Sequence, residues 1–315
     1  MESYSFLLFL AIIMISTKVL GLFSRKIHMP AVVGALAAGV LLGPSGFGMI
    51  TLDGSAGMFL EDLAEIGVIL LMFNAGLETD LGELKKNGVA SLVTAAIGVV
   101  IPLAGGFLGY AFFFHTDFAD YTEVLKAVFV GVVLTATSVS ITVETLREMG
   151  KLKGKVGTTI LGAAILDDII GIIVLTVVTS LKDTSVSPVS VLLKIIGYFI
   201  FIAVLTFILM KIRPYIEMQD EKRRVAILCV AFCFVLAYVS EEFFGIADIT
   251  GAYFAGLMLC TIKVGPYVAR RCEIPSYLIF SPVFFASVGL KVTLDGMDAS
   301  IWLFSILLLV IAILS

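Results

Sequence analysis

The chain contains the segment Gly157-Thr-Thr-Ile-Leu-Gly-Ala-Ala-Ile-Leu-Asp-Asp-Ile-Ile-Gly-Ile-Ile-Val-Leu-Thr-Val-Val-Thr-Ser180, in which Asp167 and Asp168 interrupt an otherwise apolar run. A run of this length predicts a helix that crosses a membrane. An aspartate at bilayer depth costs roughly 2.5–3.5 kcal/mol on insertion scales, and such residues usually face a cavity or a partner. The pair therefore indicates a site that binds or titrates something.

Composition places the whole chain in the membrane class. Of its 315 residues, 60% are hydrophobic and only 15% are charged, which is more apolar surface than a soluble domain of this size can bury. The period-two alternation of a membrane β-barrel is missing. We expect an all-α integral membrane protein with about eleven spanning helices, at residues 4–22, 30–42, 60–76, 89–114, 122–146, 157–181, 189–210, 225–240, 246–261, 277–290 and 300–313.

Lysine and arginine are distributed unevenly between the predicted loops. By the positive-inside rule the basic set of loops is cytoplasmic, which predicts a multi-pass protein of the cell inner (plasma) membrane with its N-terminus outside. The opposite set holds only Lys126, Lys182 and Lys291, beside acids. The basic set comprises Arg25, Lys26, Lys85, Lys86, Arg147, Lys151, Lys153, Lys155, Lys211, Arg213, Lys222, Arg223, Arg224, Lys263, Arg270 and Arg271. The partners that we expect are the lipid bilayer and small ions, with no nucleic acid.

Two small-residue motifs occur twice in the chain. Gly34-Ala-Leu-Ala-Ala-Gly-Val-Leu-Leu42 matches Gly251-Ala-Tyr-Phe-Ala-Gly-Leu-Met-Leu259, and Gly76-Leu-Glu-Thr-Asp-Leu81 matches Gly289-Leu-Lys-Val-Thr-Leu294. The loop charges orient the helices of each matched pair in opposite directions. The motifs therefore predict an inverted repeat, which is a common architecture of secondary transporters.

The repeat divides the chain into three parts. We expect a single transmembrane exchanger domain over residues 1–315, in which 1–181 form the first inverted repeat, 182–224 a linker helix and loop, and 225–315 an incomplete second repeat. The repeat logic predicts two further helices after Ser315, so we interpret the sequence as truncated at its C-terminus.

The helix before the aspartates is rich in hydroxyl groups at its centre, in Leu134-Thr-Ala-Thr-Ser-Val-Ser-Ile-Thr142. Such groups cap half-helices where a membrane helix unwinds, and the freed carbonyls and helix ends suit an ion. Hard oxygen ligands favour Na⁺, K⁺ or Li⁺ over a soft metal. Neighbouring helix residues point about 100° apart, so one aspartate faces the ion and the other faces a partner. A carboxylate that accepts either a proton or a cation is sufficient for antiport.

The segments Thr135-Ala-Thr-Ser138 and Leu166-Asp-Asp-Ile-Ile-Gly171 resemble the signature of the monovalent cation:proton antiporter superfamily, in particular its second family of bacterial Na⁺/H⁺ and Kef-like exchangers. Supporting stretches lie at 30–45, 63–78 and 281–290. The resemblance implies an inverted-repeat antiporter fold of about thirteen helices, an elevator movement, and a homodimer. It implies no cofactor and no enzymatic activity.

The resemblance assigns the binding of cation and proton to Asp168, with Asp167 as the acid that pairs with a lysine from a helix beyond Ser315. We add Thr135, Thr137 and Ser138 to the candidate ion site. Na⁺ is the expected cation; the alternative is a Kef-like potassium efflux transporter or K⁺/H⁺ antiporter. Kef-like systems usually carry Gln-Asp in place of this Asp-Asp pair.

Glu65 could serve as a proton relay or could simply form a hydrogen bond between helices, and Asp248 is interpreted as a helix N-cap. An intramembrane aspartyl protease would need carboxylates on two separate helices, which an adjacent pair does not provide. A rhomboid-like serine protease would need a histidine within a helix, whereas His28 and His115 lie in predicted loops. A channel would need a continuous polar path, and the sequence shows one polar centre instead.

Overall fold

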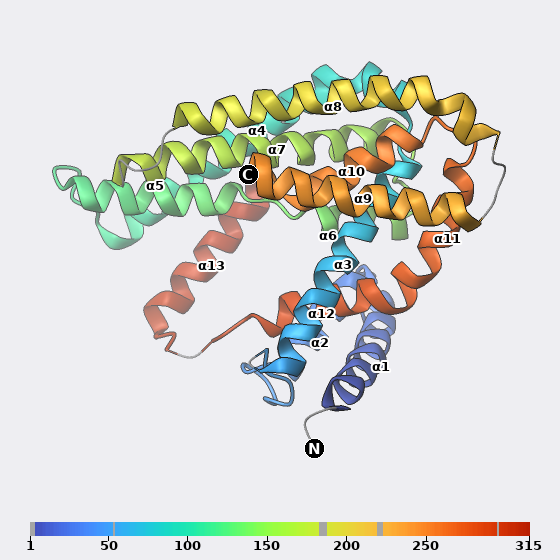
Figure 1. Ribbon diagram of the computed structural model, residues 1–315. Coiled ribbons are helices and arrows are strands. Elements are labelled where there is room, and N and C mark those ends of the chain that lie inside the picture. The colour runs from blue at the N-terminus through green and yellow to red at the C-terminus, as the bar shows by residue number, and fades with distance from the viewer. Residues whose placement is uncertain (1–3, 53, 183–187, 219–222, 295) are drawn as a thin grey trace.

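The computed structural model describes residues 4–52, 54–182, 188–218, 223–294 and 296–315. Within those ranges every regular element is a helix (Figure 1). The elements are α1 (Ser5–Lys26), α2 (Ala31–Leu42), α3 (Ser55–Glu78), α4 (Leu81–Phe114), α5 (Tyr121–Thr135), α6 (Val139–Glu148), α7 (Lys155–Lys182), α8 (Pro188–Glu217), α9 (Arg223–Phe244), α10 (Asp248–Leu259), α11 (Gly265–Pro275), η2 (Ser276–Phe280), α12 (Ser281–Leu290) and α13 (Ala299–Leu314). The expected all-α membrane architecture is confirmed, because seven helical stretches of the described residues are long and apolar enough to cross a membrane.

Each of the eleven predicted segments is helical, but several boundaries were wrong, most of all the starts of two helices. The helix expected at 277–290 begins at Gly265, because α11, η2 and α12 form one continuous stretch. Pro266 stands in the first turn of α11, where the missing N–H of proline costs nothing. The helix expected at 89–114 begins at Leu81, after the Asp80 carboxylate caps its first turn. Charged residues that we expected in loops, such as Lys85 and Arg270, therefore lie on helices. Residues 183–187 and 219–222 of the predicted linker lie outside the described residues.

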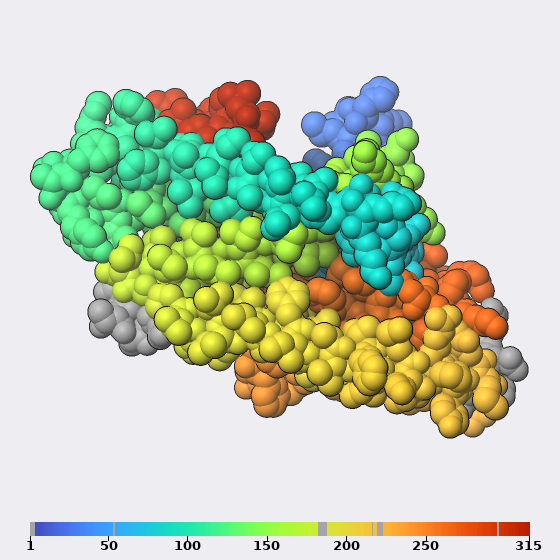
Figure 2. All heavy atoms as spheres, turned by 90° about the horizontal axis from the view of Figure 1, so that it is seen from above, coloured from blue at the N-terminus to red at the C-terminus, as the bar shows by residue number. Residues whose placement is uncertain are grey.

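The helices pack in two groups, with α6 between them. In one group α4 packs against α5, α7 and α13; in the other, α3 packs against α10 and α12, and α2 against α1 and α12. Figure 2 shows α4, α7 and α8 as neighbouring bands along one face of the molecule. α6 contacts α7 in the first group and α2 and α3 in the second. A movement of one group relative to the other would therefore act on α6.

The repeated small-residue motifs meet at two close helix crossings. Gly39 of α2 faces Gly289 of α12 at one crossing, and Gly256 of α10 faces Gly76 of α3 at the other. A Cβ on any of these glycines would collide with the backbone of the facing helix. Each crossing joins the first motif of one half of the chain to the second motif of the other half. Such close backbone contact is a common way in which membrane helices associate.

We expect Gly256→Ala to lower the thermal stability of the detergent-solubilised protein. The added methyl group would overlap the carbonyl oxygen of Phe73, and overpacking of this kind typically costs about 1–3 kcal/mol. The matched control is Gly98→Ala on α4, where no atom lies within 4 Å of the added carbon. Equal melting temperatures for the two variants would show that the α3–α10 crossing tolerates separation.

Candidate ion-binding site

The predicted break in the hydroxyl-rich helix is present. α5 ends at Thr135 and α6 begins at Val139, while Ala136 and Ser138 have extended backbone angles (φ/ψ of −68°/110° and −79°/104°). Ser138 is the N-cap of α6, and its hydroxyl oxygen accepts the backbone N–H of Ile141 at 3.4 Å. The C-terminal end of α5 and the N-terminal end of α6 therefore meet at the break, where their partial charges have opposite signs.

The hydroxyl groups around the break are arranged in two ways. Thr135 donates to the carbonyl oxygen of Val132 at 2.8 Å, and Thr142 donates to that of Ser138 at 3.0 Å, so both bonds are local to one helix. Thr137 donates to the carbonyl oxygen of Thr135 at 3.4 Å, and its hydroxyl also lies close enough to the carboxylate of Asp167 on α7 to interact with it. This proximity links the extended segment to the helix that carries the aspartates.

The two aspartates have different surroundings. Asp167 is 8% exposed, and its Oδ1 atom is buried without a hydrogen-bond partner among the described residues. Asp168 is partly buried and close enough for the two carboxylates to repel each other. Neither aspartate forms an ion pair within the part of the chain that the structure describes. An arriving cation could therefore relieve an uncompensated negative charge.

The chemistry of these groups suits a monovalent cation. Carboxylate, hydroxyl and carbonyl oxygens are hard ligands, and the break supplies hydroxyl and carbonyl oxygens beside the carboxylates of α7. Across the described residues, no three histidine, cysteine or acidic side chains cluster as they would around a transition metal. Of the predicted hydroxyl ligands, Thr137 lies close to the carboxylate of Asp167, whereas Thr135 and Ser138 lie at the ends of the two half-helices.

Glu65 of α3 lies beside Asp248 of α10. Neither residue belongs to α5, α6 or α7, which carry the break and the paired aspartates. The carboxyl groups of these two acids are close enough to interact, between α3 and the start of α10. The N-cap of α10 is Ala247 rather than Asp248, whose carboxylate accepts the N–H of Ile249 at 2.6 Å. The N-cap interpretation of Asp248 was therefore wrong by one residue. The relay role of Glu65 stays a prediction.

Sequence reasoning missed a group of ion pairs at the C-terminal end of α6. Arg147 lies 3.3 Å from Glu144 and 3.6 Å from Glu78 of α3. Glu148 lies 2.6 Å from Arg25 of α1 and also accepts the backbone N–H of Ala31 at 2.6 Å. These bonds attach α6 to the second group of helices. The only sequence signal was the density of charge in 144–148, which does not reveal partners far away in the chain.

The chain is similar to known membrane proteins over nearly its whole length. The family described as "Sodium/hydrogen exchanger, transmembrane" matches residues 9–315. The chain is 38% identical to the Na⁺/H⁺-K⁺ antiporter GerN of Bacillus cereus, covering 99% of this chain and 78% of that protein. It is also 38% identical to a Na⁺/H⁺ antiporter of Enterococcus hirae, covering 97% and 78%. The structure of the sodium proton antiporter MjNhaP1 from Methanocaldococcus jannaschii at pH 8 shares the fold, with a TM-score of 0.68 and 20% identity over 100% of this chain and 80% of that chain.

Proposed function

Since this chain belongs to the family of transmembrane sodium/hydrogen exchangers, we propose that it is a secondary antiporter that exchanges Na⁺ for protons and that Asp168 holds each of them in turn. The observation that supports the assignment of the site is the proximity of the Thr137 hydroxyl, in the break between α5 and α6, to the carboxylate of Asp167 on α7. The oxygen-rich segment therefore lies beside the paired aspartates.

The proposed exchange follows from competition for one carboxylate. When Asp168 is ionised, Na⁺ binds its oxygens together with hydroxyl and carbonyl groups of residues 135–138. When a proton neutralises Asp168, the attraction for Na⁺ is lost and the cation leaves. The two states are mutually exclusive because a charge at this depth must be compensated. Asp167, which lies close to Thr137, is assigned the pairing role, because its buried Oδ1 has no hydrogen-bond partner among the described residues.

Alternating access would come from movement of the two helix groups. We assign residues 1–181 and 225–315 to the two inverted repeats, with 182–224 between them. The equivalent crossings at Gly39–Gly289 and Gly76–Gly256 support this division, since each motif packs against the other half of the chain. Binding at the interface of such repeats allows the site to open to one side at a time.

The proposal also covers the transported cation, the membrane and the oligomeric state. We infer Na⁺ as the main cation, with K⁺ or Li⁺ as alternatives, because the relatives named above are Na⁺/H⁺ and Na⁺/H⁺-K⁺ antiporters. The distribution of charge supports a place in the cell inner (plasma) membrane with the N-terminus outside. We further propose a homodimer that works without a cofactor and catalyses no covalent reaction.

The function is tested by reconstituting the full-length protein into liposomes that contain a pH-sensitive dye. An external pulse of NaCl should drive protons out of the lumen and make it alkaline, and KCl should produce a smaller rate at equal concentration. An equal response to sucrose at matched osmolarity would show leakage instead of exchange. A response to KCl that exceeds the response to NaCl would favour the potassium alternative.

A further inference from the structure

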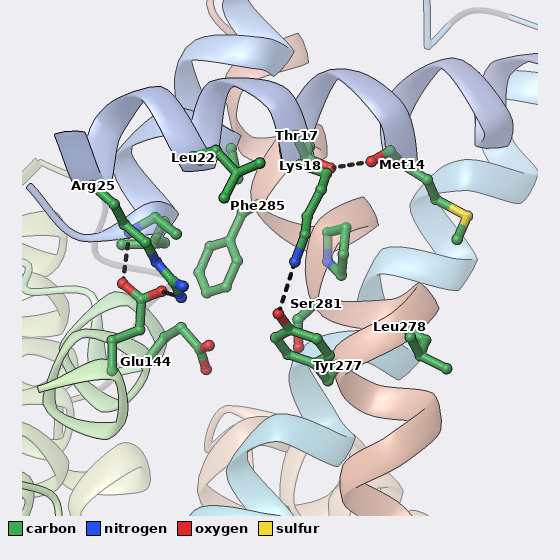
Figure 3. Close-up of a pocket in the computed structure, with 16 residues that line it drawn as sticks. Met14, Thr17, Lys18, Leu22, Arg25, Glu144, Tyr277, Leu278, Ser281 and Phe285 are labelled. Carbon is green, nitrogen blue, oxygen red and sulfur yellow. Dashed lines mark hydrogen bonds and ion pairs between the residues drawn. The ribbon is translucent and has the colours of Figure 1, made fainter. Parts of the chain in front are cut away.

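A cavity of about 250 Å³ opens beside α1, on the side of the molecule that carries Arg25 (Figure 3). α1 and α2 form one wall of the cavity, and α6, η2 and α12 form its remaining walls. The volume lies below the roughly 300–1,000 Å³ of pockets for drug-sized ligands. It is therefore suited to a small polar group, such as the headgroup of a larger molecule.

The mouth of the cavity lies on an apolar outer surface. Leu22, Tyr277 and Leu278 line the cavity and are each more than half exposed (54%, 52% and 53%). In a membrane-spanning bundle such side chains face acyl chains. Lys18 lies eight residues before Lys26, the last residue of α1, which is roughly 12 Å along the helix at 1.5 Å per residue. A ligand can therefore enter sideways from the lipid, and its headgroup would lie below the level of Lys26 in order to reach Lys18.

The cavity presents one positive and one negative group. The ammonium of Lys18 donates to the hydroxyl of Tyr277 at 3.1 Å and lies 5.4 Å from the centre of that ring, but it has no carboxylate partner among the described residues. Glu144 points into the same space from the opposite wall (Figure 3). The Oε2 atom of Glu144 is paired with Arg147 at 3.3 Å, while Oε1 has no ion pair among the described residues. The other charged pair of the lining, Arg25 and Glu148, is joined at 2.6 Å.

The wall that carries Tyr277 has an unusual backbone. Residues Ser276–Phe280 form a π-helical turn between α11 and α12, and such turns frequently mark functional sites. The Oγ atom of Ser276 is buried with no hydrogen-bond partner in the described part of the chain. The wide turn places Tyr277 at the mouth of the cavity, where it holds Lys18.

We propose that this cavity binds the headgroup of a zwitterionic phospholipid with a primary ammonium, of the phosphatidylethanolamine class. The phosphate would be held by Lys18 and the Tyr277 hydroxyl, and the lipid ammonium by the carboxylate of Glu144. The acyl chains would lie along Leu22 and Leu278. Basic pockets between helices bind anionic phospholipid headgroups, whereas this lining carries acidic as well as basic side chains. The carboxylate of Glu144 opposite Lys18 therefore favours a zwitterionic headgroup with an N–H donor.

The test is a titration of the purified full-length protein with short-chain lipids, followed by thermal shift. Dihexanoyl-phosphatidylethanolamine should bind saturably and more tightly than the matching phosphatidylcholine, which has no N–H group, or phosphatidylglycerol, which has no ammonium. Glu144→Gln should remove that preference. Lys18→Met should weaken all three lipids about tenfold, as expected for the loss of one charge-assisted hydrogen bond. Lys86→Met, an exposed lysine on α4, is the control and should change nothing.

Three results would overturn the proposal. Equal binding of the ethanolamine and glycerol lipids by the unaltered protein would remove the role of the carboxylate. Unchanged lipid binding by Lys18→Met would remove the phosphate site. Equal stabilisation by free phosphoethanolamine would assign the cavity to a soluble ligand. The lipid preference of the unaltered protein decides the case even where a variant does not fold, and it does not depend on whether the protein exchanges Na⁺.

Discussion

Asp168→Asn is expected to abolish exchange while leaving the protein folded. The asparagine side chain has the same shape, but it carries no charge to attract Na⁺ and cannot take up the proton in its place. We expect the response to an NaCl pulse in everted vesicles, read as dequenching of a pH-gradient dye, to fall to that of vesicles without the protein. The loss would be a loss of turnover, and the melting temperature should change little, because removing an unpaired charge from the bilayer costs nothing.

The neighbouring residue provides the matched control. Asp167→Asn removes the same charge one position earlier in α7, beside Thr137. It should retain part of the exchange but change its electrogenicity or the stability of the protein. Dequenching at the normal rate in Asp168→Asn would disprove the assignment of the carrier residue. If Asp167→Asn behaved like the unaltered protein in every assay, the pairing role of Asp167 would be wrong.

The second large effect is expected from Arg147→Met. Its guanidinium lies between Glu144 and Glu78, and all three side chains are mostly covered (23%, 14% and 23% exposed). Removing one partner of a buried ion pair typically costs about 3–5 kcal/mol, because the opposite charge is left uncompensated. Partial exposure places this case near the lower end, at about 3 kcal/mol. We therefore expect a clearly lower melting temperature and slower exchange.

A second substitution separates charge from packing. Combining Arg147→Met with Glu144→Gln should recover part of the lost stability, because one of the stranded carboxylates is removed. Lys86→Met is the control for loss of a cation at the surface, since the Lys86 side chain is 73% exposed and such pairs contribute about 0–1 kcal/mol. An Arg147→Met protein as stable as the Lys86→Met protein would show that the ion pairs do not hold α6 to α3.

The hydrophobic pattern predicted the helices well because a membrane constrains them so strongly. Each backbone group must be paired within its own helix, so length and hydropathy located all eleven segments. The break after Thr135 was also predictable. The five hydroxyl groups at mid-helix offer local partners to the backbone groups that a break leaves unpaired. The start of α11 at Gly265 was not predicted, because Arg270 and Arg271 make that stretch look like a loop although it is helical.

Contacts between distant parts of the chain could not be predicted from one sequence. The helical repeat showed that Asp167 and Asp168 point apart, but not which of them meets Thr137. Likewise, charge in 144–148 indicated a helix end, while its bonds to Arg25 and Glu78 depend on how α1, α3 and α6 are arranged. The pairing of Glu65 with Asp248 is of the same kind.

The central claim is that one carboxylate, Asp168, holds either a cation or a proton. It is tested most directly by adding NaCl to the purified protein in weakly buffered detergent solution and recording the release of protons. We predict that Na⁺ releases protons saturably from the unaltered protein and from Asp167→Asn, and releases none from Asp168→Asn. Proton release of normal size from Asp168→Asn would contradict the account, because the exchanged proton would then reside elsewhere.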